Sequence, residues 1–220
     1  MKYRSVFDII GPVMIGPSSS HTAGAVRIGQ LARKIYGREP QQILVQFYGS
    51  FAETYKGHAT DVAVIGGILA FETDDVRIPD SLAIAAERGI AVTFSREEAV
   101  PNHPNTMKIT LQSDGDPLEV TGISIGGGTV QITELNGFPL RLSGDNPALL
   151  ILHKDAYGTI ASVTDILAIY RINVSNMEVS RIEKGKDALM VIETDQSVPP
   201  EAIQIIANRD NILKVIVLEK

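Results

Sequence analysis

A run of small hydroxyl residues early in the chain has the composition of an anion-binding site. Residues 16–24 are Gly-Pro-Ser-Ser-Ser-His-Thr-Ala-Gly, and the apolar periodicity that follows predicts a helix over residues 22–36. Free backbone N–H groups, hydroxyls and the positive end of a helix dipole together bind carboxylates and phosphates. His21 adds a group that titrates near neutral pH. Helix capping alone needs one such residue, so we favour a ligand site. Its candidate residues are Ser18, Ser19, Ser20 and Thr22.

A second histidine lies just before another expected helix. Residues 55–61 are Tyr-Lys-Gly-His-Ala-Thr-Asp, and helical periodicity extends over residues 60–71. A histidine followed by a carboxylate three positions on could be an oriented general base. A surface turn in which Asp61 complements the helix N-terminus is, taken alone, the slightly stronger interpretation. Two histidine-bearing helix starts in one domain nevertheless favour convergence of His21 and His58 on one cleft.

Three further loops carry polar or glycine-rich sequence. Residues 101–107 (Pro-Asn-His-Pro-Asn-Thr-Met) are equally consistent with a rigid loop of fixed donors and acceptors and with a plain turn leading into a strand. Gly126–Gly128 interrupts two expected strands, for which we favour a structural role. The loop Asp155–Gly158 joins a strand to a helix, and its N–H groups could hold a carboxylate. His153 lies in an apolar strand and is more typical of a structural histidine.

The last third of the chain has the pattern of a ferredoxin-like unit. Short alternating apolar segments and two helical segments follow one another in the order βαββαβ, which places two helices on one face of a four-stranded sheet. The expected strands cover residues 148–153, 173–182, 188–193 and 212–218, and the expected helices cover residues 159–170 and 197–207.

The preceding part of the chain predicts a mixed α/β domain, so that the fold class of the whole is α+β. A turn-rich segment at residues 141–147 marks the boundary, giving domains 1–146 and 147–220. In the first domain we expect helices over residues 22–36, 60–71 and 81–88, and strands over residues 43–48, 91–95, 107–112, 118–125 and 130–135.

Composition narrows the classes of partner. The 220 residues carry a formal net charge of -6, which argues against nucleic acid or an anionic membrane as the main partner. We find no stretch long and apolar enough for a membrane span and no signal-peptide core, so we expect a cytoplasmic protein. The sequence has no cysteine, which excludes thiolate ligation of a metal or cluster by this chain.

Four motifs together resemble the β region of bacterial iron–sulfur L-serine dehydratases. They are residues 16–24, Gly-His-Ala-Thr-Asp at 57–61, Asn-His-Pro-Asn at 102–105 and Ser-Ile-Gly-Gly-Gly at 124–128. The resemblance covers essentially the whole first domain, a β-type fold similar to the allosteric substrate-binding domain of some phosphoglycerate dehydrogenases. The C-terminal unit is similar to ACT domains, regulatory modules that commonly pair with one another and bind amino acids.

The resemblance implies an activity, a cofactor and a partner. In the family, L-serine is converted to pyruvate and ammonia with a [4Fe-4S] cluster as the Lewis acid. The cluster cysteines belong to the α region, so a chain without cysteine implies a separate cysteine-bearing α subunit and no metal ligand of its own.

The resemblance also implies roles for individual residues. Ser18, Ser19, Ser20 and Thr22 would hold the substrate carboxylate. His58 is the first choice for the proton-transferring group and His21 the second. His103 and Asn105 match a loop with an allosteric role, while Asp155 and Gly158 take the usual ligand-loop position of an ACT domain that would also mediate self-association.

Two other classes of function are compatible with the same modules. One is a regulatory amino-acid-binding protein without a catalytic role, and the other is an adaptor that dimerises through its ACT domain. The serine-rich loop together with His58 favours the enzyme, because α-proton removal needs a titratable group and a sensor or an adaptor does not.

Overall fold

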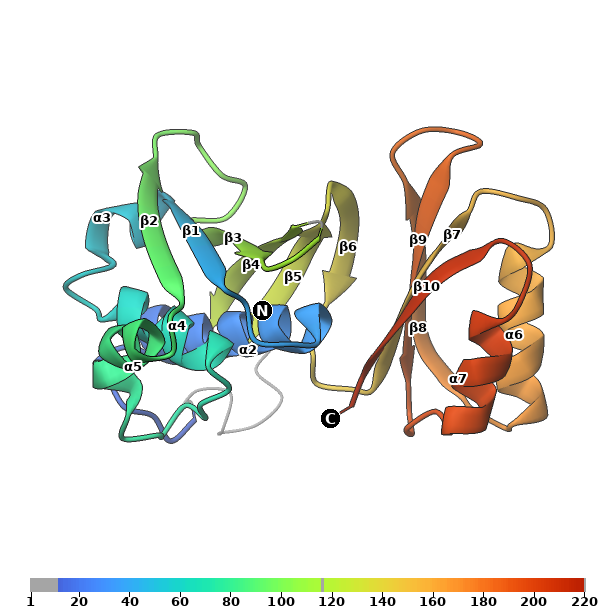
Figure 1. Ribbon diagram of the computed structural model, residues 1–220, viewed down its shortest axis with the longest axis horizontal. Helices are drawn as coiled ribbons and strands as arrows, with labels where there is room; N and C mark the ends of the chain where they lie inside the picture. The colour runs from blue at the N-terminus through green and yellow to red at the C-terminus, as the bar shows by residue number, and fades with distance from the viewer. Residues whose placement is uncertain (1–11, 116, 220) are drawn as a thin grey trace. The chain divides into compact units, whose positions relative to one another are not determined.

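The structure is a computed structural model that describes residues 12–115 and 117–219. These residues form two compact units, of which one reaches Asn136 and the other begins at Gly137 (Figure 1). Helices occur with a six-stranded sheet in one part of the chain and with a four-stranded sheet in the other. The α+β class expected from the sequence is therefore confirmed.

The first sheet is mixed. Strand β1 runs parallel to β2 and antiparallel to β3, and β3, β4 and β5 are successive antiparallel neighbours, in the order β2-β1-β3-β4-β5-β6. Strand β6 belongs to the second unit, where it contacts β8 and β9. The strands are β1 (Gln42–Tyr48), β2 (Ala91–Glu97), β3 (Asn105–Gln112), β4 (Leu118–Gly126), β5 (Thr129–Leu135) and β6 (Phe138–Leu142).

The helix α2 is the central helix of this unit. It packs against β3, β4 and β5 on one side and against α4 on another, because its apolar residues recur at helical spacing and are buried. Figure 1 shows α2, α4 and α5 on the same side of the sheet. The helical elements are η1 (Ser19–Ala23), α2 (Gly24–Tyr36), α3 (Gly49–Thr54), α4 (Thr60–Ile68), η2 (Ile78–Asp80) and α5 (Ser81–Glu87).

Four short elements in this region, η1, η2, α3 and β6, were not expected from the sequence. The first turn of the expected helix over residues 22–36 is a separate π-helical turn, η1, which starts three residues earlier. The six-residue helix α3 and the five-residue strand β6 are too short to show a clear apolar period. The expected helix over residues 60–71 ends at Ile68, because Leu69 and Ala70 turn the chain and Ala70 takes a positive φ of 64°.

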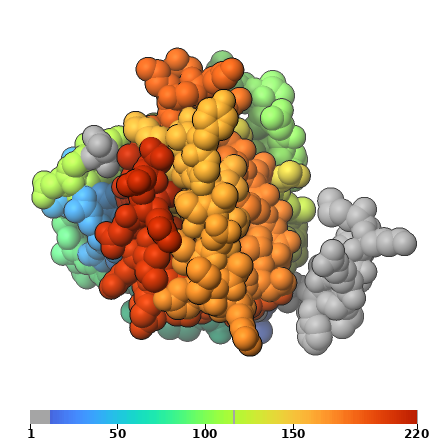
Figure 2. All heavy atoms as spheres, turned by 90° about the vertical axis from the view of Figure 1, so that its right-hand side faces the viewer, coloured from blue at the N-terminus to red at the C-terminus, as the bar shows by residue number. Residues whose placement is uncertain are grey.

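The second unit contains the ferredoxin-like arrangement predicted from the sequence. Its sheet has the order β10-β7-β9-β8, with every neighbouring pair antiparallel. Helices α6 and α7 lie side by side on one face (Figure 2) and cover the alternate residues Leu149, Ile151, Met190 and Ile192. The elements are β7 (Ala148–Lys154), α6 (Thr159–Ile169), β8 (Val174–Arg181), β9 (Asp187–Thr194), α7 (Pro200–Ala207) and β10 (Ile212–Leu218).

Candidate active site

The serine-rich loop folds into the π-helical turn η1 at the start of α2. Ser18 is its N-cap, with extended backbone, and its Oγ accepts a hydrogen bond from the backbone N–H of His21 at 3.1 Å. Ser19 and Ser20 are half-buried, and their side chains form no hydrogen bond with other described residues. The loop therefore satisfies its cap with one serine and leaves two hydroxyls available to a ligand.

The imidazole of His21 is held on both sides by serine hydroxyls. Its Nε2 lies 3.0 Å from Oγ of Ser50, at the start of α3, and its Nδ1 lies 3.5 Å from Oγ of Ser18. The edge of the ring also packs against Phe51, with the two ring centroids 5.2 Å apart. These contacts fix the orientation of His21 even though the residue is partly exposed.

His58 lies against His21, as the convergence of two helix starts predicted. The two imidazole centroids are 4.7 Å apart, and the hydroxyl of Thr22 donates to the carbonyl oxygen of His58 at 3.0 Å. The chain turns sharply after His58, since Ala59 takes a positive φ of 56° as the N-cap of α4. Nδ1 of His58 is buried and has no hydrogen-bond partner within residues 12–115 and 117–219. Of the two histidines, His58 is thus the less constrained.

The proximity of the two rings affects their protonation. Burial lowers the pKa of His21 below its usual value of 6.5, and a positive charge on His58 lowers that pKa further. The lowered pKa favours the neutral form of His21. A neutral, fixed His21 beside a free His58 is an arrangement suited to proton transfer by His58.

The loop at residues 102–105 lies at the same site. The backbone N–H of Ser50 donates to the carbonyl oxygen of Pro104 at 2.8 Å, and Nδ2 of Asn105 donates to the carbonyl oxygen of Ser124 at 3.4 Å. The ring of His103 accepts a hydrogen bond from the backbone N–H of Asn105 at 3.2 Å, which shapes the loop itself. Asn105 therefore supports the site through backbone groups, whereas the described contacts of His103 are confined to its own loop.

The glycine-rich turn between β4 and β5 also reaches the serine loop. A Cβ added to Gly126 would lie 3.8 Å from Oγ of Ser20, and a Cβ on Gly24 would lie 2.2 Å from Oγ of Ser124. The hydroxyl of Ser124 is fully buried and has no partner in the described part of the chain. The structural role favoured for Gly126–Gly128 thus includes close approach to the candidate site.

Comparison with known proteins identifies the family. A sequence profile described as "Serine dehydratase beta chain" matches residues 5–134, and one described as "ACT domain" matches residues 148–211. A probable L-serine dehydratase beta chain of Bacillus subtilis (strain 168) is 60% identical over 98% of this chain and 98% of its own length. The chain belongs to the serine dehydratase beta chain family.

Two further relatives match most of this chain. An L-serine dehydratase beta chain of Peptoniphilus asaccharolyticus is 37% identical to this beta chain over 87% of both proteins. A D-3-phosphoglycerate dehydrogenase of Synechocystis is 26% identical over 80% of this chain but only 32% of its own length. The second match agrees with the expected similarity to a domain found in phosphoglycerate dehydrogenases.

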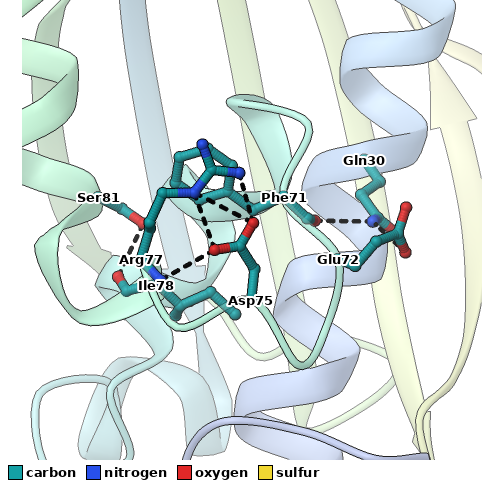
Figure 3. A network of polar contacts seen from close by, with 7 residues as sticks. All are labelled: Gln30, Phe71, Glu72, Asp75, Arg77, Ile78 and Ser81. Carbon is teal, nitrogen blue, oxygen red and sulfur yellow. Dashed lines mark hydrogen bonds and ion pairs between the residues drawn. The ribbon is translucent and has the colours of Figure 1, made fainter.

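A network of hydrogen bonds holds the segment that enters the serine loop. Thr73 accepts the backbone N–H of Ile15 on its carbonyl oxygen at 2.8 Å and donates its hydroxyl to the carbonyl oxygen of Val13 at 2.8 Å. Gln30, on α2, donates to the carbonyl oxygen of Phe71 at 2.8 Å (Figure 3). The incoming segment is thereby connected to the same helix that carries the serine loop.

The turn that contains Thr73 has its own stabilising contacts. The guanidinium of Arg77 binds the carboxylate of Asp75 with a shortest distance of 2.6 Å and lies 4.1 Å from the ring centroid of Phe71 (Figure 3). Hydrogen bonds from Arg77 lower the pKa of Asp75 to about 2. The carboxylate of Asp75 is therefore ionised around neutral pH.

Backbone contact between α2 and α4 sets the separation of the two histidines. A Cβ on Gly67 would lie 2.0 Å from the carbonyl oxygen of Val26, and a Cβ on Gly29 would lie 2.3 Å from that of Val64. Only glycine permits two helices to approach this closely. Since His21 and His58 lie just before these helices, the glycines determine how near the rings come.

The ACT loop of the beta chain is occupied by contacts within the chain. The carboxylate of Asp155 accepts hydrogen bonds from the backbone N–H of Gly185 at 2.9 Å and from Arg181 at 2.7 Å. The hydrogen bond from Gly185 is the largest cause of a lowered pKa at Asp155, and the bond from Arg181 is the next. Gly158 takes a left-handed conformation with a φ of 81° at the N-cap of α6. His153 is buried in β7, as expected of a structural residue, and its Nε2 has no partner among the described residues.

Two residues of the site were not singled out from the sequence. Ser50 is the second residue of α3, which follows β1, and this helix is only six residues long. Ser124 was included in a motif without a role of its own. No group of three or more His, Asp or Glu side chains suited to a metal ion occurs in the described ranges, and none of their helices is long and apolar enough to cross a membrane.

Proposed function

We propose that the chain is the β subunit of an iron–sulfur L-serine dehydratase, which converts L-serine to pyruvate and ammonia together with a separate cluster-bearing α subunit. Two relatives that match nearly the whole chain are named L-serine dehydratase beta chains. The observation that carries the proposal is the contact between His21 and His58 beside the free hydroxyls of the serine loop. An acid–base pair next to an anion site suits removal of the α-proton of an amino acid.

In the proposed site the hydroxyls divide into two groups. Ser19 and Ser20 have no hydrogen bonds to described residues, so they bind the substrate carboxylate directly, together with backbone N–H groups of η1. Ser18 and Thr22 already engage His21 and the carbonyl oxygen of His58. Their contribution to carboxylate binding is therefore to hold the loop and the two histidines in place.

His58 removes the α-proton, and His21 stays neutral beside it. The charge that His58 acquires is confined to one ring, because the lowered pKa of His21 keeps that neighbour uncharged. The [4Fe-4S] cluster, when bound by the α subunit, supplies the Lewis acid that assists departure of the β-hydroxyl. A chain without cysteine fits this division, since it offers no thiolate to the cluster.

The other expectations fit the same proposal. Asn105 and His103 form a regulatory loop that reaches the active site through Ser50 and Ser124. The ACT domain, which we begin at residue 147, mediates self-association, and its loop Asp155–Gly158 is the place for an amino-acid effector. The enzyme is cytoplasmic, and neither nucleic acid nor a membrane is a partner of this acidic chain.

The deciding experiment is anaerobic deamination of L-serine by the chain alone and by the chain mixed with its cysteine-bearing α partner. We expect pyruvate only from the mixture, because the chain alone lacks the Lewis acid. Absence of pyruvate from a mixture whose cluster is intact would contradict the proposal. Amino-acid binding by the isolated chain would then favour a purely regulatory protein.

A further inference from the structure

Ser50 lies where the 102–105 loop and the serine loop meet. Its hydroxyl is 3.0 Å from Nε2 of His21, although the two residues are 29 positions apart in the chain. Its backbone N–H donates to the carbonyl oxygen of Pro104 at 2.8 Å. One residue thus contacts the candidate catalytic pair with its side chain and the 102–105 loop with its backbone.

The backbone position of Ser50 is fixed by its neighbours. Gly49 takes a positive φ of 54°, and a Cβ there would lie 2.6 Å from the carbonyl oxygen of Pro104. Gly49 also forms an antiparallel bridge with Asn105, and the hydroxyl of Thr54 donates to the carbonyl oxygen of Ser50 at 2.7 Å. The start of α3 is consequently held from both sides, so the hydroxyl of Ser50 is presented to His21 from a fixed point.

The contact has a chemical consequence for the histidine pair. With Ser18 near Nδ1 and Ser50 at Nε2, both ring nitrogens of His21 face a hydroxyl, whereas the side chain of His58 has no hydrogen-bond partner in the described ranges. A ring held at both nitrogens keeps one orientation, because each hydroxyl can donate to or accept from the nitrogen that it faces. We propose that Ser50 is a positioning residue, which holds Nε2 of His21 so that the ring stays fixed beside His58.

The kinetic consequence of this inference rests on the proposed function. Its structural consequence does not. Nitrogen-15 shifts of the ring nitrogens can be measured on the full-length chain alone, where only four histidines are present. In the unaltered chain we expect the Nε2 signal of His21 to have the shift of a hydrogen-bonded ring nitrogen. The shift of an Nε2 without a hydrogen bond would overturn the proposal without any variant.

Variants then test whether the hydroxyl of Ser50 is responsible. Ser50→Ala should shift the Nε2 signal of His21 and leave the signals of His153 unchanged, whereas Ser50→Thr, which keeps a hydroxyl, should retain the Nε2 shift of the unaltered chain. Glu53→Ala is the matched control, since it changes an exposed residue of the same helix. An equal shift in Glu53→Ala, or no shift in Ser50→Ala, would contradict a specific role.

In the assembled enzyme, Ser50→Ala should lower kcat about tenfold, the size expected for loss of one orienting hydrogen bond, with a smaller change in KM. Ser50→Thr should recover most of the loss. A rise in KM at unchanged kcat would instead assign Ser50 to substrate binding and overturn the proposal. If the unaltered mixture makes no pyruvate, the proposed function fails, while the nitrogen-15 measurement still decides the role of Ser50.

Discussion

The loops that precede η1 and α6 differ in how they use their polar groups. At η1, the hydroxyls of Ser19 and Ser20 and Nδ1 of His58 have no partner within the described residues. At α6, the carboxylate of Asp155 is bound by Gly185 and Arg181, and the hydroxyl of Thr159 donates to Ala156. Polar groups without internal partners mark a loop that serves a ligand, whereas the second loop first stabilises its own hairpin.

The largest effect should follow from removing His58, the unconstrained histidine that contacts His21 of the first loop. His58→Ala should lower turnover of the assembled enzyme at least about 100-fold, because general-base catalysis contributes this much. The fold should persist, since Thr22 bonds to the backbone of residue 58 and not to its ring. Steady-state kinetics and sedimentation measure the two effects.

Lys56→Ala changes an exposed residue of the same turn and is the matched control for His58→Ala. Turnover by His58→Ala close to that of this control would remove His58 from the mechanism. The difference between the two loops would then be one of structure alone.

A methyl group at the helix contact should destabilise the first unit. Gly67→Ala places a Cβ 2.0 Å from the carbonyl oxygen of Val26, so we expect a loss of about 1 to 3 kcal/mol in the free energy of unfolding. Gly57→Ala is the control, because the nearest atom to its Cβ would be 3.7 Å away. Denaturant unfolding of both variants gives the comparison, and equal stability would show that α2 and α4 can separate without cost.

The lowered pKa of His21 predicts a smaller, pH-dependent effect on stability. His21 has a pKa lowered by burial and by His58, so the unfolded chain binds the proton more readily. The contribution of His21 to stability is therefore present above the unfolded pKa of about 6.5 and is lost as the pH falls through that value towards the folded pKa. His21→Gln should flatten the dependence of unfolding free energy on pH in this window. An unchanged slope would mean that His21 does not titrate with folding.

The smallest effect concerns the closed loop of the ACT domain. Asp155→Asn weakens the bonds to Gly185 and Arg181, so the amide hydrogen of Gly185 should exchange faster while overall stability changes little. Asp187→Asn, which breaks an ion pair with Lys154 in the same unit, should leave that amide unaffected. Similar exchange in both variants would show that Asp155 does not hold the loop closed.

The sequence predicted the elements and motifs better than the contacts that connect them. The strands of the ACT domain follow from apolar alternation, and its helices follow from helical periodicity. Two histidine-bearing helix starts predicted the meeting of His21 with His58. Ser50 could not be found in this way. A serine at a helix start is usually a cap, and only the tertiary fold brings it to a residue 29 positions away. The unexpected η1, η2, α3 and β6 are short, so their formation depends on neighbours more than on local pattern.

The glycine contact between α2 and α4 turns a distant position into a determinant of precision at the site. Gly29 lies eight residues beyond His21, which corresponds to about 12 Å along a helix. If α2 tilts about this contact, the displacement grows with distance from it and is therefore larger at the imidazole. Variation that alters the histidine spacing can therefore arise two turns away, at a residue that no substrate would ever touch.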